Sequence, residues 1–243
     1  MEIKRDLLLK RLIDLRHNGM IKVVTGMRRC GKSYLLFNLF TDALKAKGVD
    51  EENIVQINLE DRRNKSLRDP DKLLAYIDSR LKDNKMYYIL LDEVQLVNEF
   101  EDVLNSYLQV KNADVYVTGS NARFLSKDVI TEFRGRGLEI RVHPLSFSEI
   151  RGARPDEPIE QLWIEYITYG GLPQVITMNS DQEKVDYLKG LFKHTYLKDI
   201  KERYDIKLDG DLEELISTLA STVGGLTNPR KLADTFRTVK KST

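Results

Sequence analysis

Five short runs that are rich in apolar residues and have strand character alternate with segments of helical periodicity over roughly the first 145 residues. The runs lie at residues 21–25, 54–59, 86–91, 115–118 and 138–142. In the segments between them, apolar residues recur every three or four positions, as on one face of a helix. This alternation is typical of a parallel sheet with helices on both faces. The sequence therefore predicts an α/β fold with three layers, α/β/α.

The expected helices divide the chain into three parts. Within the α/β part they span 4–17, 32–47, 69–81, 98–108, where Asn98 and Glu101 resemble a capping box, and 122–134. After Pro144 no strand is expected, and helical periods recur at 146–151, 158–169, 181–203, 211–223 and 229–239. We predict an α/β domain at 1–150, an all-helical lid at 151–208, and a partial winged-helix or helix-turn-helix-like segment at 209–243.

Composition and charge exclude several classes of protein. No apolar run approaches the ~18–20 residues that cross a membrane, and the charged opening segment lacks a signal-peptide core. The only cysteine, Cys30, cannot form an intrachain disulfide, as expected in a reducing cytoplasm. Lys and Arg number 39 against 38 Asp and Glu, so no global excess of charge points to nucleic acid or to an acidic membrane. A cytoplasmic protein without a membrane partner is expected.

The first strand ends in a motif that is typical of phosphate binding. Residues 26–33 read Gly-Met-Arg-Arg-Cys-Gly-Lys-Ser, which satisfies G-x-x-x-x-G-K-[ST], between an apolar strand and a helix. Glycines let backbone N–H groups turn toward phosphate oxygens, and the helix N-terminus adds its positive dipole. Lys32 would contact the β- and γ-phosphates, and the Ser33 hydroxyl would bind Mg²⁺. The other candidate nucleotide contacts are Gly26, Met27, Arg28, Arg29, Cys30, Gly31 and Tyr34. A chance match is the alternative.

Two acidic residues, Asp92 and Glu93, follow the apolar run at 86–91, in the form of a Walker B strand. The carboxyl end of such a strand lies beside the phosphate loop in a parallel sheet. Asp92 is expected to hold Mg²⁺ through water, and Glu93 to activate the water that attacks the γ-phosphate. The alternative is that both carboxylates are merely solvated. Because the chain has no Asn-Lys-x-Asp guanine motif, and a kinase has less need of such a glutamate, the pair favours nucleotide hydrolysis.

Polar residues near two other strand ends are further candidates. Ser120 and Asn121 follow the fourth strand and could lie between the γ-phosphate and the attacking water, although Gly-Ser-Asn is also ordinary turn chemistry. Arg134 and Arg136 precede the fifth strand. Either could stabilise the transition state, from a neighbouring subunit or after a conformational change, and the alternative is a solvated loop arginine. The three histidines show no spacing that is typical of a metal site.

These segments together resemble a known ATPase family. The resemblance also rests on Leu-Asp-Glu-Val-Gln (91–95), Val-Thr-Gly-Ser-Asn (117–121), Gly-Arg (135–136), His-Pro-Leu-Ser-Phe-Ser-Glu (143–149) and Gly-Gly-Leu-Pro (170–173). The chain resembles prokaryotic AAA+-like ATPases that carry a C-terminal domain of unknown function and lie near the STAND class of signalling ATPases. The resemblance implies a P-loop NTPase fold of the ASCE type with strand order 5-1-4-3-2. Because the usual C-terminal domain is absent, a shortened form of a longer protein is expected.

The resemblance also implies roles for individual residues. Lys32 and Ser33 would bind phosphate and Mg²⁺, Asp92 would support Mg²⁺, and Glu93 would be the catalytic base. Ser120 or Asn121 would be the sensor, Arg136 the family's arginine, and Pro173 would pack near adenine. For Pro173, a tight turn between helices is the alternative. The segment around Lys4 and Arg5 would close the adenine side.

The leading functional hypothesis is an ATPase that needs Mg²⁺ and acts as a nucleotide-driven conformational switch. A second hypothesis is a signalling module that binds ATP or ADP with negligible hydrolysis and acts on itself or on a protein partner through the absent C-terminal part. A third is a DNA-associated AAA+ motor or loader, since residues 226–243 hold five basic residues against one acidic residue. A solvated helix face explains those charges equally well. A kinase is the fourth hypothesis.

Overall fold

The computed structural model describes residues 3–119, 133, 135–197, 200–201, 209–225, 228–230 and 233–234. The chain divides into two compact units, Met1–Thr195 and Tyr196–Thr243. The helix expected at 122–134 lies outside the described residues apart from Phe133, and so does most of the helix expected at 229–239.

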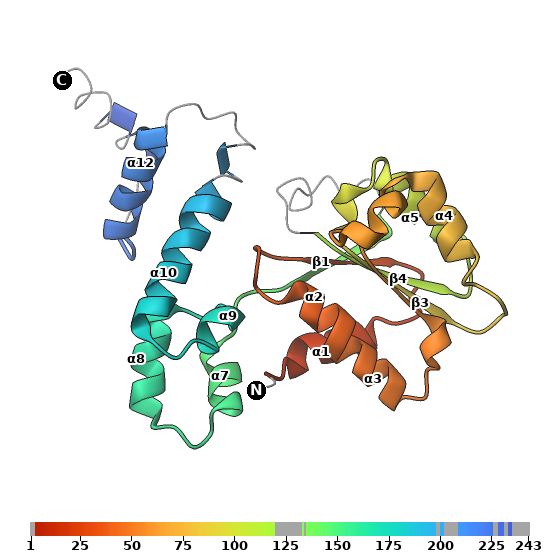
Figure 1. Ribbon diagram of the computed structural model, residues 1–243, viewed down its shortest axis with the longest axis horizontal. Helices are drawn as coiled ribbons and strands as arrows, with labels where there is room; N and C mark the ends of the chain where they lie inside the picture. The colour runs from red at the N-terminus through yellow and green to blue at the C-terminus, as the bar shows by residue number, and fades with distance from the viewer. Residues whose placement is uncertain are drawn as a thin grey trace. The chain divides into compact units, whose positions relative to one another are not determined.

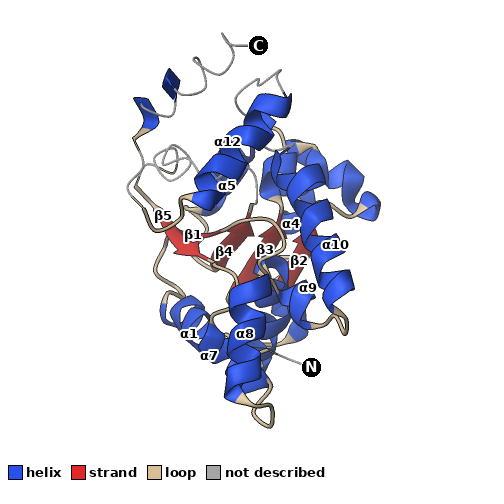
Figure 2. Ribbon diagram, turned by 90° about the vertical axis from the view of Figure 1, so that its left-hand side faces the viewer, coloured by secondary structure: helices blue, strands red, loops and turns tan. Residues whose placement is uncertain are grey.

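A parallel sheet forms the centre of the first unit. Its strands are β1 (Ile21–Thr25), β2 (Ile54–Asn58), β3 (Tyr87–Asp92), β4 (Ala113–Thr118) and β5 (Gly137–Arg141). The strand order is β2-β3-β4-β1-β5 with every neighbouring pair parallel (Figure 2), which confirms the expected order 5-1-4-3-2. β1 and β3 are buried along their whole length. Residues 87–91 of β3 are apolar without alternation because both faces of the strand are covered, whereas β1 also holds Lys22, whose buried ammonium group pairs with Asp114.

Helices cover both faces of the sheet (Figure 1). On one face lie α1 (Asp6–Asp14), α2 (Lys32–Tyr34) and α3 (Thr41–Ala46), and on the other lie α4 (Pro70–Asp78) and α5 (Phe100–Tyr107). A π-helical segment, Leu35–Phe40, joins α2 to α3. Two apolar clusters, one on each face, pack these helices against the strands, so the expected three layers are confirmed.

The start of α5 differs from the sequence prediction. Glu99 occupies the N-cap position with a φ of 52°, and no side chain caps this helix, so the capping box predicted at Asn98 and Glu101 is wrong. The left-handed turn at Glu99 leaves Asn98 one residue before the position from which an N-cap side chain reaches the first turn. In α4 the expected start is present, because the Asp69 carboxylate accepts a hydrogen bond from the Lys72 N–H.

After β5 the described part of the first unit is helical. It contains α7 (Phe147–Ala153), α8 (Ile159–Tyr169), α9 (Pro173–Ile176) and α10 (Asp181–Leu191), and π-helical turns follow at Phe192–Tyr196, the last residue of which is the first of the second unit. A small apolar core of Leu145, Ile150, Leu162 and Ile176 packs α7, α8 and α9 together. The second unit contains α12 (Asp209–Ser221). Within the described residues, no helix combines the length and the apolar character that crossing a membrane requires.

Candidate nucleotide-binding site

The phosphate loop has a backbone that only glycine permits at one position. Gly26 has a φ of 144°, and a Cβ atom there would lie 2.2 Å from the Val142 carbonyl oxygen. Gly31 and Arg29 are also left-handed, with φ values of 95° and 64°. A left-handed conformation at a non-glycine residue such as Arg29 is strained, and such strain collects at functional sites.

Lys32 lies inside the loop. It is buried, and its Nζ donates hydrogen bonds to the carbonyl oxygens of Gly26 at 3.0 Å and Met27 at 3.1 Å. The loop therefore curls around the ammonium group. Because an ammonium group has three N–H donors, these two contacts leave donor capacity for an anion.

Two hydroxyl groups converge on Asp92 at the carboxyl ends of β3 and β4. The Ser33 hydroxyl donates to Asp92 Oδ1 at 2.8 Å, and the Thr118 hydroxyl donates to the same oxygen at 2.5 Å. Asp92 is 2% exposed, and this burial raises the pKa of its carboxyl group, against the opposing effect of the two hydroxyl donors. Thr118 was not singled out from the sequence, although its place at the end of a buried strand was a usable signal.

Glu93 is held by its backbone and its carboxylate. Its φ is 55°, and its N–H donates to Thr118 Oγ1 at 3.0 Å, so Thr118 joins the two acidic residues. The Gln95 side-chain amide donates a hydrogen bond to the Glu93 carboxylate. Glu93 also lines a pocket together with Lys32 and Ser33.

A pocket of about 510 Å³ brings most of the predicted residues together. It is lined by Arg28, Arg29, Gly31, Lys32, Ser33, Tyr34, Glu60, Glu93, Pro173, Gln174, Tyr187 and Thr195. Its walls thus come from the loop, from the carboxyl ends of β2 and β3, and from α9, α10 and the turns after α10. The Gly31 Cβ position lies 3.6 Å from Pro173 Cγ, so the 170–173 motif meets the loop directly.

Four lining residues, Glu60, Gln174, Tyr187 and Thr195, were missed by sequence reasoning. The Arg29 guanidinium lies 5.8 Å from the centroid of the Tyr187 ring. The Tyr187 hydroxyl oxygen is buried and has no hydrogen-bond partner among the described residues. A buried polar atom without a partner is costly, so this hydroxyl fits a pocket that receives a polar ligand. No local pattern in 181–191 distinguishes Tyr187 from an ordinary helix residue.

Some predicted residues do not line the pocket. The Cys30 sulfur is buried and donates to the Val142 carbonyl oxygen at 3.4 Å, and burial raises the pKa of this thiol. Arg136 is exposed and is not among the described lining residues; its carbonyl accepts from the Ile21 N–H. Gly26 and Met27 contribute the carbonyl groups that hold Lys32. Ser120, Asn121 and Arg134 lie outside the described residues.

The donor set at Asp92 fits Mg²⁺ bound together with a phosphate. Across the described ranges, no three His, Cys, Asp or Glu side chains gather in a way that could hold a metal ion by themselves. Mg²⁺ usually keeps several waters and binds through one or two carboxylates and the oxygens of a phosphate substrate. The buried Asp92 carboxylate and the adjacent Ser33 hydroxyl supply that type of protein ligand.

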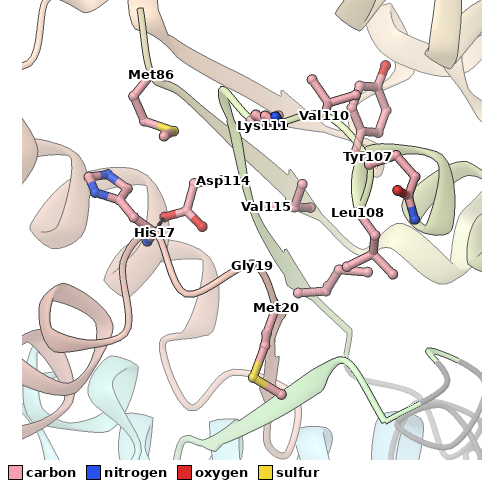
Figure 3. A pocket seen from close by; sticks show the side chains of 13 residues that line it. His17, Gly19, Met20, Met86, Tyr107, Leu108, Val110, Lys111, Asp114 and Val115 are labelled. Atoms are coloured by element: carbon pink, nitrogen blue, oxygen red, sulfur yellow. Dashed lines mark hydrogen bonds between the residues drawn. The ribbon is translucent and has the colours of Figure 1, made fainter.

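A second pocket, of about 250 Å³, lies near the amino ends of β1 and β4 (Figure 3). Its lining includes Asp114, whose Oδ2 accepts from the His17 N–H at 3.1 Å and from the Tyr116 hydroxyl at 3.0 Å. The buried Lys22 ammonium pairs with Asp114 Oδ1. Both carboxylate oxygens are thus already engaged, so the chemistry of Asp114 is structural.

Comparison with known proteins is consistent with this geometry. Residues 18–151 match the family described as AAA domain, and residues 160–243 match a domain of unknown function (DUF8612). An uncharacterized protein of Haemophilus influenzae is 34% identical over 239 residues, covering 96% of this chain and 59% of that protein. An uncharacterized protein of Methanocaldococcus jannaschii is 27% identical over 230 residues, covering 89% of this chain and 50% of that protein.

The chain thus spans between half and three fifths of the length of these curated relatives. Among solved structures, AMPPCP-bound DnaA from Aquifex aeolicus is 11% identical, with 89% of this chain and 67% of that chain covered and a TM-score of 0.45. The AAA-domain match includes the phosphate loop and the Asp-Glu pair and extends over more than half of the residues. This chain therefore belongs to the AAA domain family.

Proposed function

We propose that this protein binds ATP with Mg²⁺ and hydrolyses it, and that the nucleotide acts as a conformational switch. The observation that carries the proposal is the pocket that Lys32, Ser33 and Glu93 share with Pro173 and Tyr187. Phosphate-binding groups and a carboxylate line one side, and helices from beyond the sheet line the other. A ligand in this pocket would contact both, so its γ-phosphate would bias how closely α9 and α10 approach the loop.

Each residue would have a distinct task in the reaction. The Lys32 ammonium would exchange its contacts with loop carbonyls for contacts with phosphate oxygens. Ser33 and Asp92 would hold Mg²⁺, which when bound supplies positive charge to the phosphates. The Glu93 carboxylate would orient a water and accept its proton. Pro173 and Tyr187 would contact the nucleoside end of the ligand.

The deciding experiment is phosphate release from ATP, with and without Mg²⁺, for the wild type, Glu93→Gln and Lys32→Ala. We expect Glu93→Gln to bind ATP and lose turnover by about 10²-fold or more, because general-base catalysis contributes about that factor. Lys32→Ala should lose nucleotide binding as well. A matched control is Lys45→Ala, which removes an exposed lysine on α3 that is not among the residues lining the pocket. Turnover that survives in Glu93→Gln would contradict the proposed base.

The contact between Gln95 and Glu93 favours one rival, a nucleotide-binding signalling module with negligible hydrolysis. A carboxylate oxygen that accepts from an amide is less available to a water molecule. If the wild type binds ATP or ADP without turnover and Lys32→Ala abolishes that binding, this second function is the better description. Turnover in the wild type excludes it.

Several finer assignments remain proposals that rest on the sequence. They are the division at 1–150, 151–208 and 209–243, the STAND-like character, a cytoplasmic location, and self-association or a protein partner. Binding to DNA would depend on residues 226–243, of which the structure describes 228–230 and 233–234. Salt-dependent DNA binding that is lost on deletion of 226–243 would support that last proposal.

A further inference from the structure

The segment 143–149 connects β5 to α7. With Val142 it forms a strut, Val142–Glu149, that runs from the end of β5 into α7. At its start, the Val142 carbonyl oxygen occupies the space where Gly26 would carry a Cβ and accepts the Cys30 thiol. The strut therefore packs directly against the back of the phosphate loop.

The strut also holds the motif at 170–173. The Leu145 N–H donates to the Gly171 carbonyl oxygen at 2.7 Å. A Cβ atom at Gly171 would lie 2.0 Å from the Leu145 carbonyl oxygen, so the two backbones are in contact without side chains between them. Two residues later, Pro173 lines the pocket beside Gly31. One short segment thus contacts the phosphate loop at one end and the Pro173 motif near the other.

Arg5 joins the strut to the loop. Its side chain is 7% exposed although it stands near the start of the chain. Nη1 donates to the Cys30 carbonyl oxygen at 3.1 Å, Nη2 to the His143 carbonyl oxygen at 2.8 Å, and Nε to Glu149 Oε1 at 3.1 Å. The other oxygen of Glu149 accepts from the Ser146 N–H at 2.7 Å and caps α7.

These contacts use the planar guanidinium in a way that a lysine cannot reproduce. The three acceptors lie 25, 138 and 144 residues after Arg5 in the sequence, and all three are bound by one rigid guanidinium group. The Cys30 carbonyl belongs to the loop whose N–H groups must face the ligand. Fixing that carbonyl on the outer side of the loop fixes the orientation of the peptide between Cys30 and Gly31, whose N–H is on the opposite side.

We propose that Arg5 is a positioning residue that holds the phosphate loop in its anion-binding conformation and couples it, through the strut, to the Pro173 motif. The guanidinium contacts the loop from behind and does not line the pocket, so Arg5 acts through the loop backbone. This inference rests on the proposed nucleotide function. It assigns to Arg5 a task different from closing the adenine side.

The test compares Arg5→Lys with Arg11→Lys in the full chain. Arg11 is a matched control, since it also stands near the start of the chain, on α1, and donates to a backbone carbonyl, that of Glu139, at an exposed position. Amide hydrogen exchange, followed by mass spectrometry, reports on residues 26–33 and 143–149 without any nucleotide. Binding of ADP with Mg²⁺ is measured in parallel by calorimetry.

We expect Arg5→Lys to accelerate exchange in 26–33 and 143–149, with β3 and β4 unchanged. ADP should bind about tenfold more weakly, the scale of one lost charge-assisted hydrogen bond. Arg11→Lys should alter neither. Unchanged exchange in the loop of Arg5→Lys overturns the inference, whatever happens to stability. If ADP fails to bind even the wild type, the proposed function fails, while the exchange result still decides whether Arg5 holds the loop.

Glu149→Gln is a second variant that weakens the same contact and can be measured if Arg5→Lys does not fold. A glutamine can still cap α7 at Ser146, but it removes the negative charge that faces Arg5. We expect the same two segments to exchange faster, by a smaller factor. Uniformly faster exchange throughout the first unit in both variants would show a purely structural role and overturn the inference.

Discussion

At the scale of single residues, the carboxylate of Asp92 is needed for the proposed binding of Mg²⁺ but lowers the stability of the folded protein. It is a buried carboxyl group whose pKa is raised, and burial is the main cause. A raised pKa means that the folded state binds a proton more tightly than the unfolded state does. The contribution of Asp92 to the free energy of unfolding is therefore lost as the pH rises from the unfolded pKa through the folded pKa. The ionised carboxylate at neutral pH destabilises the folded state relative to the protonated form in acid.

We expect Asp92→Asn to raise the melting temperature at neutral pH by a few degrees and to abolish hydrolysis that depends on Mg²⁺. Asparagine keeps an oxygen for the Ser33 and Thr118 hydroxyls and removes the buried charge. The stability gain should shrink as pH falls through the pKa of Asp92, because the wild type then becomes neutral too. Calorimetric melting over a pH series checks this, with the exposed Asp42→Asn as control. A variant that is less stable at every pH would contradict the argument.

The ion pair between Lys22 and Asp114 gives a second prediction at this scale. Both side chains are almost fully buried, and burial lowers the pKa of Lys22 despite the opposing carboxylate. Asp114→Asn should cost about 3–5 kcal/mol of unfolding free energy, because it leaves a buried ammonium group unpaired. The loss should ease at alkaline pH, where Lys22 releases its proton.

Adding Lys22→Met to Asp114→Asn should recover much of that stability. The second substitution removes the unpaired charge, while the amide oxygen introduced by the first can still accept from the His17 N–H. Urea unfolding of the two single variants and the double variant gives the coupling energy of the pair. If the loss of unfolding free energy in the double variant equals the sum of the losses in the two single variants, the interaction between Lys22 and Asp114 contributes nothing to stability.

At the scale of elements, a backbone contact joins the strut to the 170–173 motif, in which α9 begins at Pro173. Gly171→Ala should cost about 2–3 kcal/mol, because a methyl group cannot fit against the Leu145 carbonyl oxygen without a backbone shift. Gly190→Ala is the matched control in α10, where the added Cβ would meet nothing within 4 Å. There the change should stabilise by about 0.5–1 kcal/mol, the ordinary helix preference for alanine. Equal effects of the two substitutions, measured by chemical denaturation, would refute the contact.

The elements also separate what local sequence predicts from what it does not. The strands were predicted closely because each predicted run is rich in apolar residues, and the Asp69 cap marked the start of α4. The prediction of a capping box at Asn98 was wrong because Glu99 adopts a left-handed conformation and takes the N-cap position. The local sequence contains no signal for that conformation. α9 is only four residues long, too short to show a helical period.

At the scale of the whole molecule, the position of Arg136 bears on how the site is completed. Arg136 is exposed and does not line the described pocket. We therefore expect it, if it stabilises the transition state, to do so in a second copy of the chain. Specific ATPase activity should then rise with protein concentration, and Arg136→Ala should be nearly inactive.

Mixing Arg136→Ala with Glu93→Gln should restore activity under that arrangement, because a mixed interface can contain one intact Glu93 and one intact Arg136. Phosphate release from the mixture, compared with each variant alone at the same total concentration, is the measurement. If the mixture shows no more activity than each variant alone, and if the specific activity of the wild type does not depend on protein concentration, Arg136 does not act on the site of a second chain.

The sequence by itself determined the α/β class, the phosphate loop, and the Asp-Glu pair at the end of a buried strand. Those features are local, since each depends on residues that are neighbours along the chain or share one periodic face. The tertiary structure alone decided that Tyr187 and Glu60 line the pocket and that Arg5 meets Cys30, His143 and Glu149. Such contacts join segments far apart in sequence, and they leave no period or spacing from which they could be predicted.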